Sequence, residues 1–96
     1  KKEPWADRKR RYFAHLPHAA DDVLLVSGSD KLHNARAILS DLQRIGRRVF
    51  DRFSSSEEQT LWYYDQLVRV HVQRGTPIAA SLREVVDRIH QLARNP

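Results

Sequence analysis

The sequence predicts an all-α protein, a helical bundle of about four helices. Three observations lead to this fold class. Apolar residues recur at spacings of three and four along most of the chain, which is the pattern of amphipathic helices. Proline and glycine residues divide the chain at points where helices would have to end. The single run with strand-like composition, DVLLV at residues 22–26, continues into a helical pattern without a break.

Two helices are expected in the first half of the chain. The first spans residues 4–16, and Pro17 prevents it from continuing because a proline ring clashes with the preceding helical turn. The second spans residues 20–45, and Asp21 and Asp22 place negative charge at its amino end, where the helix dipole is positive. Apolar side chains surround the axis in the first half of this second helix, which is typical of a helix in the middle of a bundle.

Two further helices are expected in the second half. The third spans residues 56–74 and follows capping-box patterns that begin at Ser54 and Ser55. Gly75 suits the end of this helix, because glycine readily adopts the left-handed conformation found there. The fourth follows Thr76, a residue type favoured as an N-cap, and its apolar residues repeat at alternate spacings of four and three, a seam for helix packing. These residues are Ile78, Leu82, Val85, Ile89 and Leu92.

Length and composition bound the class of protein. The chain has 96 residues, enough for one small domain or part of one. It contains no apolar run of about 18 residues and no signal-peptide pattern, so we expect no membrane partner and a cytoplasmic location. Cysteine is absent, which excludes disulfides and thiolate metal sites.

Positive charge is concentrated at the amino end. The first eleven residues include six basic and two acidic ones, a balance of +4, against +5 for the whole chain. Such a segment could attract nucleic acid or an anionic nucleotide, although a solvated basic helix face is the more common meaning of this pattern. Aromatic residues are too few and too scattered for a base-stacking platform, so we do not expect nucleic acid as the partner.

One acidic residue, Asp30, lies on an apolar side of the second helix. Val23, Val26 and Ala37 lie within about 40° of it on a helical wheel, and Asn34 lies one turn later on the same side. A buried, isolated carboxylate is costly and usually has a partner. Three interpretations follow. Asp30 pairs with an arginine of another helix, or it binds a metal ion, or it faces solvent because the helix is less buried than its composition suggests.

The segment SDKLHNAR, residues 29–36, resembles the motif A-D-[KR]-L-x-N-x-R of HD-domain phosphohydrolases. The closest likeness is to the hydrolase domains of RelA/SpoT proteins and to the small alarmone hydrolases. The similarity extends over RKRRYFAHLPHAADDVLLVSGSDKLHN, residues 8–34, and over EEQTLWYYDQLV, residues 57–68. The resemblance implies the all-α HD fold and a hydrolase that acts on a nucleotide such as guanosine tetraphosphate.

The resemblance also implies a set of functional residues. The family binds one divalent metal ion, typically Mn²⁺, through a histidine, an adjacent His-Asp pair and a later aspartate, and Asp30 matches the later aspartate. Oxygen and imidazole ligands suit such an ion, which would activate water for attack on a phosphate ester or pyrophosphate. Lys31 and Asn34 match positions near the phosphates and sugar of the substrate, and Tyr63 matches an aromatic residue that contacts the nucleotide.

The remaining metal ligands of the family have no counterpart in this chain. It contains no His-Asp dipeptide, and it contains no methionine. We therefore expect residues 1–96 to be the C-terminal half of a single HD-type domain, inactive alone, whose N-terminal half supplies the other ligands. Without that half, the second helix is expected to expose a large apolar face, so that the chain associates with the missing half or with a copy of itself. The rival interpretation is a shortened homologue that has lost catalysis.

Two alternatives to a hydrolase remain open at this point. One is a non-catalytic basic module that contacts nucleic acid or a protein partner through the first helix, with Arg8, Lys9, Arg11 and also Lys1 on one exposed face. The other is a structural bundle without chemistry, in which Asp30 forms a closed ion pair.

Overall fold

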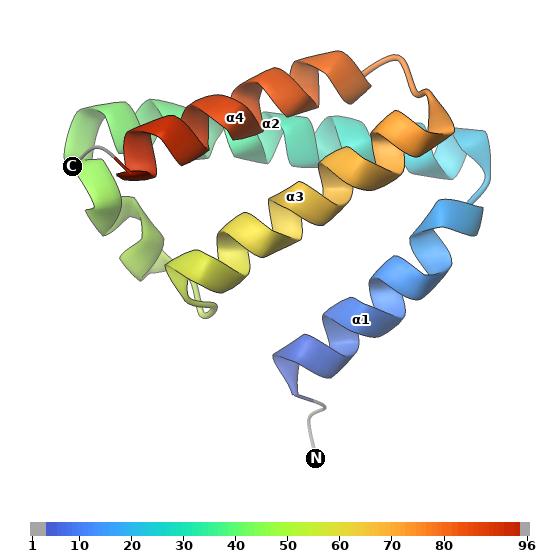
Figure 1. The fold of residues 1–96 in the computed structure, drawn as a ribbon, viewed down its shortest axis with the longest axis horizontal. Coiled ribbons are helices and arrows are strands. Elements are labelled where there is room, and N and C mark those ends of the chain that lie inside the picture. Colours follow the sequence, from blue (N-terminus) through green and yellow to red (C-terminus); the bar gives the residue numbers. More distant parts are fainter. Residues whose placement is uncertain (1–3, 95–96) are drawn as a thin grey trace.

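In the computed structural model, which describes residues 4–94, the chain folds into four α-helices and two short 3-10 helices. Their order is α1 (Trp5–His15), η1 (Leu16–His18), α2 (Asp21–Ile45), η2 (Gly46–Arg52), α3 (Glu57–Arg74) and α4 (Ala79–Arg94). Figure 1 shows α4 lying along α2, with α3 running obliquely beside this pair and α1 at the edge. No strand occurs within residues 4–94, and the prediction of an all-α bundle of four helices is confirmed.

The hydrophobic core lies where α2, α4, α3 and η2 meet. Each of these elements contributes at least one side chain that is almost completely inaccessible to solvent. These side chains are Leu24 of α2, Val49 of η2, Leu67 of α3, and Leu82, Val86 and Ile89 of α4. Burial of a leucine, isoleucine or valine side chain contributes about 1.5–3 kcal/mol, so this cluster is the main source of stability.

Only one side of α2 is buried. Leu24 and Leu32 face the core, but the side chains of Val23 and Val26 are 56% and 72% exposed. The expectation that the first half of α2 is covered all round is therefore wrong. Its composition is apolar on every side, but α4 and η2 pack on one side of α2, and α1 approaches it near Ser27. The side of α2 that carries Val23 and Val26 is therefore exposed to solvent.

Helix α2 packs closely on the end of α3 at Gly28. A Cβ atom at this position would lie 2.3 Å from Cε1 of His71 and 3.0 Å from Cδ1 of Ile78. The His71 side chain is 1% exposed, and its Nδ1 is 2.8 Å from the Thr76 hydroxyl. Burial lowers the pKa of His71, which favours the neutral ring. The absence of a side chain at Gly28 is thus what makes room for a buried imidazole.

Two helix boundaries differ from the sequence-based expectation. The capping box of α3 is formed by Ser56 and Gln59, each of which bonds the other's backbone N–H at 3.0 Å. It lies one to two residues later than the boxes expected from the serine run. Helix α4 begins at Ala79 and not directly after Thr76, whose hydroxyl is engaged by His71. Gly75 ends α3 with φ +63°, as expected.

An arginine and a group of aromatic rings fix α1 and its connection to α2. The Arg74 guanidinium donates to the carbonyl oxygens of Pro17 at 3.0 Å and Ala19 at 2.6 Å, and it pairs with Asp21. Aromatic side chains of α1 and α3 then pack against one another, with ring centroids 5.5–6.4 Å apart across the two helices. The pairs are Trp5–Trp62, Phe13–Trp62, Phe13–Tyr63 and Tyr12–Tyr63. These contacts bring basic residues of α1 to the side of α3 that carries Tyr63.

Candidate active site

Asp30 lies on the exposed side of α2. Its carboxylate is 64% exposed, and it forms an ion pair with the adjacent Lys31 at 3.5 Å. Among residues 4–94, Asp30 therefore faces solvent, which is the third of the interpretations that the sequence left open. The same residues contain no group of three or more histidine, cysteine, aspartate or glutamate side chains that could hold a metal ion. Asp30 is therefore at most one ligand of a metal site in the described part of the chain.

Asp30 also occupies the middle of a regular line of exposed residues on α2. We call this line the α2 stripe, and its members are Val23, Val26, Asp30, His33, Ala37 and Ser40. All six are exposed, and they follow one another at spacings of three, four, three, four and three residues. Residues at these spacings lie along one side of a helix, and three of the six are apolar. The α2 stripe is therefore an exposed side of α2 with a carboxylate in its middle and apolar residues before and after it.

Lys31 and Tyr63, which are far apart in the sequence, line the same pocket. Its volume is about 210 Å³, and we call it the lysine pocket. The eight residues that line it come from α1, α2, α3 and the segment before α3. They are Trp5, Lys9, Lys31, Phe53, Ser55, Thr60, Tyr63 and Tyr64. The structure thus brings two of the four predicted site residues together and adds a second lysine, Lys9.

Electrostatics in the lysine pocket follow from burial and from the neighbouring charges. The Lys9 ammonium lies 4.8 Å from the centroid of the Tyr63 ring and 5.9 Å from that of Tyr12. Burial lowers the pKa of Lys9, and repulsion from Arg8 and Lys31 lowers it further. Burial also raises the pKa of the Tyr63 phenol. Burial therefore disfavours the charged forms of both Lys9 and Tyr63 in this pocket.

Asn34 lines a neighbouring pocket of about 290 Å³ on the other side of Phe53 and Tyr64, which belong to both linings. The carboxylate of Asp30 is not part of either lining, but it is near enough to Tyr64 to influence that side chain. Burial raises the pKa of Tyr64 to about 12, and the charge of Asp30 contributes to the increase. The four predicted residues therefore lie on one region of the surface, distributed over two pockets and the exposed side of α2.

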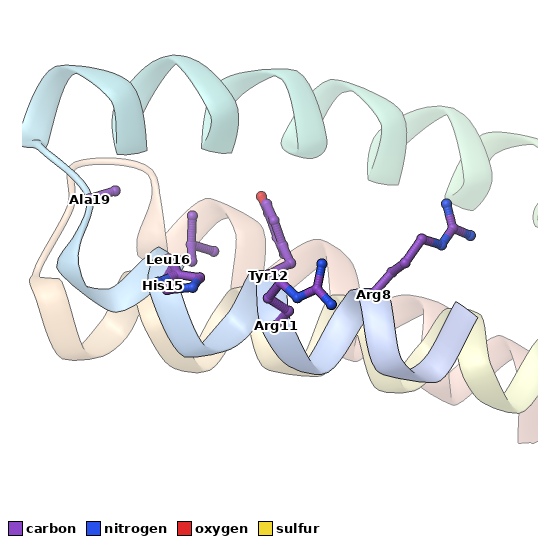
Figure 2. A pocket seen from close by; sticks show the side chains of 6 residues that line it. All are labelled: Arg8, Arg11, Tyr12, His15, Leu16 and Ala19. Atoms are coloured by element: carbon purple, nitrogen blue, oxygen red, sulfur yellow. The ribbon is translucent and has the colours of Figure 1, made fainter. Parts of the chain in front are cut away.

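The basic run of α1 does not form one face. Lys9 lines the lysine pocket, whereas Arg8 and Arg11 line a different and larger pocket of about 530 Å³ with Tyr12 and His15. Figure 2 shows these side chains along α1, with Tyr12 directed toward α2, where its hydroxyl is 3.4 Å from that of Ser27. Lys1 lies outside the described residues. The basic residues Arg8, Lys9 and Arg11 of α1 thus line two pockets.

Lys9 is the functional candidate that sequence reasoning missed. In the sequence, Lys9 is one member of a run of four basic residues, 8–11, and its charge does not separate it from the others. The signal that could have separated it is its spacing from Tyr12, since residues three apart lie on the same side of a helix. The packing of Tyr12 on Tyr63 then directs this side of α1 to α3.

The comparisons with known proteins add no family assignment. The sequence matches no model of a known protein family, and no curated protein matches it either. Within residues 4–94, no helix is both long and apolar enough to cross a membrane. The motif around Asp30 and the geometry of its surroundings are therefore the basis for proposing a function.

Proposed function

We propose that this chain is the C-terminal half of a metal-dependent phosphohydrolase of the HD class, similar to the alarmone hydrolases. Its reaction is the release of phosphate or pyrophosphate from a nucleotide such as guanosine tetraphosphate. The observation that carries the proposal is the α2 stripe, an exposed and partly apolar side of α2 with Asp30 in its middle. A half-site of this kind is what one part of a divided metal centre would present.

In this proposal the α2 stripe is covered by the N-terminal half of the domain. Val23 and Val26 form the apolar end of the contact, and their burial would stabilise the association by about 1.5–3 kcal/mol each. The other half contributes the histidine and His-Asp ligands. Asp30 would hold Mn²⁺ through its carboxylate, a ligand type that suits this ion.

The residues around Asp30 then bind the substrate. Lys31 neutralises phosphate charge, Tyr63 provides an aromatic surface for the nucleotide, and Asn34 offers amide hydrogen bonds to the sugar. When bound, the metal ion would lower the pKa of a water molecule and so supply the nucleophile. We place the reaction in the cytoplasm, with a nucleotide as the small-molecule partner.

A hydrolysis assay on the full-length product of the gene tests this function. We expect Mn²⁺-dependent release of phosphate or pyrophosphate from guanosine tetraphosphate, and we expect Asp30→Asn to reduce it at least about 100-fold, because a ligand of the activating ion is lost. Folding should be unaffected, because asparagine keeps the size and shape of the aspartate side chain.

The matched control is Asp87→Asn, which removes an exposed carboxylate from α4 and should leave the rate within about twofold. Equal rates for the wild-type protein and the Asp30→Asn variant would contradict the proposed role of Asp30.

A further inference from the structure

We propose that the lysine pocket is an anion-binding site that takes a phosphate or pyrophosphate group on this chain alone, with Lys9 and Lys31 as its recognition residues. The inference goes beyond the proposed function because it needs neither a metal ion nor the other half of the domain. It rests on contacts among described residues of α1, α2 and α3.

The charge of the pocket lining is the first argument. Two ammonium groups, those of Lys9 and Lys31, line a pocket of about 210 Å³ whose lining contains no acidic residue. This volume is about seven times the ~30 Å³ that one water molecule occupies in the liquid, which leaves room for an oxyanion with some of its hydration. Asp30 pairs with Lys31 from outside the pocket, at 3.5 Å, and offsets only part of the positive charge.

The second argument is the position of Lys9, whose ammonium is restrained by contacts within the chain itself. It lies 4.8 Å from the Tyr63 ring centroid, within the range of a cation–π interaction. The neighbouring Tyr12 stacks on Tyr63, with centroids 6.4 Å apart and an interplanar angle of 24°, and its hydroxyl contacts Ser27. A lysine restrained in this way loses less conformational freedom on binding, which favours affinity.

The hydroxyl groups of the pocket support the assignment of recognition to the lysines. The Thr60 hydroxyl donates to the Ser56 carbonyl oxygen at 2.9 Å. Because this bond uses its only proton, the 2.9 Å contact between the Thr60 and Ser55 hydroxyls must have Ser55 as donor. The Ser55 and Thr60 hydroxyl protons are therefore engaged, and Lys9 and Lys31 are the only cationic donors of the lining.

The surroundings of Lys9 disfavour its charged form. Burial and the positive charges of Arg8 and Lys31 lower its pKa. An oxyanion beside the ammonium would oppose these effects and favour the charged form. Binding of an anion should therefore raise the pKa of Lys9, and this change can be followed separately from affinity.

The experiment is a calorimetric titration of inorganic pyrophosphate into the chain in EDTA-containing buffer at constant ionic strength. We expect saturable binding that Lys9→Gln and Lys31→Gln each weaken at least about 10-fold. The control is Arg10→Gln, which alters an exposed cation of α1 that pairs with Asp7, and which should change affinity less than twofold. Equal binding by the wild-type protein and the Lys9→Gln variant would overturn the proposal.

A second measurement keeps the test independent of variant folding. The pKa of Lys9 in the wild-type chain, followed by NMR of its ¹³Cε, should rise by at least half a unit at saturating pyrophosphate, on the order of a 0.7 kcal/mol change. An unchanged pKa would overturn the proposal.

A parallel titration with GDP identifies the source of the group. Binding at least fivefold tighter than that of pyrophosphate indicates a nucleotide phosphate packed on Tyr63, and equal affinities indicate a bare phosphate; both results support the anion site.

Discussion

Replacing Gly28 with alanine is expected to lower the free energy of unfolding by about 2–3 kcal/mol, the cost of overpacking a closed core. The added methyl carbon would lie 2.3 Å from Cε1 and 2.6 Å from Nε2 of His71, far inside van der Waals contact. The imidazole is buried and held by Thr76, so it has little space into which to move. Chemical denaturation of the two proteins measures the difference.

Two further variants isolate the cause. Ser29→Ala changes the next residue of α2, which is exposed, and should alter stability by less than about 0.5 kcal/mol. In a double-mutant cycle, His71→Ala should remove most of the cost of Gly28→Ala, because the atoms that clash are gone. A Gly28→Ala protein as stable as the wild type, or additive effects in the cycle, would show that the close packing of α2 on α3 is not as described.

Val26→Glu is expected to change the free energy of unfolding little in the isolated chain and strongly in the full-length gene product. In the isolated chain the Val26 side chain is 72% exposed, so the stability of the monomer should change by less than about 0.5 kcal/mol. In the full-length gene product the α2 stripe is covered according to our proposal, and a buried, unpaired carboxylate there should cost about 3 kcal/mol or more.

The isolated chain is also expected to associate with copies of itself through the exposed stripe. Val26→Glu should weaken this association at least about 10-fold in sedimentation experiments, since it places charge in an apolar contact. The control is Val72→Glu on α3, which is also an exposed valine, 47% accessible, but lies outside the stripe. Two results would contradict the proposal that the α2 stripe is a contact surface. One is equal weakening of association by both variants, and the other is a full-length Val26→Glu protein as stable as the wild type.

The helices could be predicted because their limits are encoded locally. Pro17 follows α1 closely and Gly75 ends α3, since each has a backbone constraint that acts at its own position. Two members of the apolar seam predicted for the fourth helix, Leu82 and Ile89, lie in the core. The N-cap of α3 was predicted one to two residues too early. Three consecutive serines offer the same hydroxyl, and the sequence alone does not distinguish Ser56 from the other two.

The site could be predicted only in part, because its shape depends on the packing of distant segments. The motif around Asp30 pointed to Lys31 and Asn34, which lie on the same helix. Periodicity could not show which side of α2 its neighbours cover, so the exposure of Val26 was not evident from its apolar surroundings. The position of Lys9 over an α3 ring depends on the angle at which α1 packs, which no local pattern encodes.

The central claim is that Asp30 is one ligand of a metal site completed by another part of the protein. The most direct measurement is a calorimetric titration of Mn²⁺ into the full-length gene product and into the isolated chain. We predict one bound ion in the full-length product, at least about 100-fold weaker binding in its Asp30→Asn variant, and no tight binding by the isolated chain. Mn²⁺ binding that is unchanged by Asp30→Asn, or tight binding by the isolated chain, would contradict the claim.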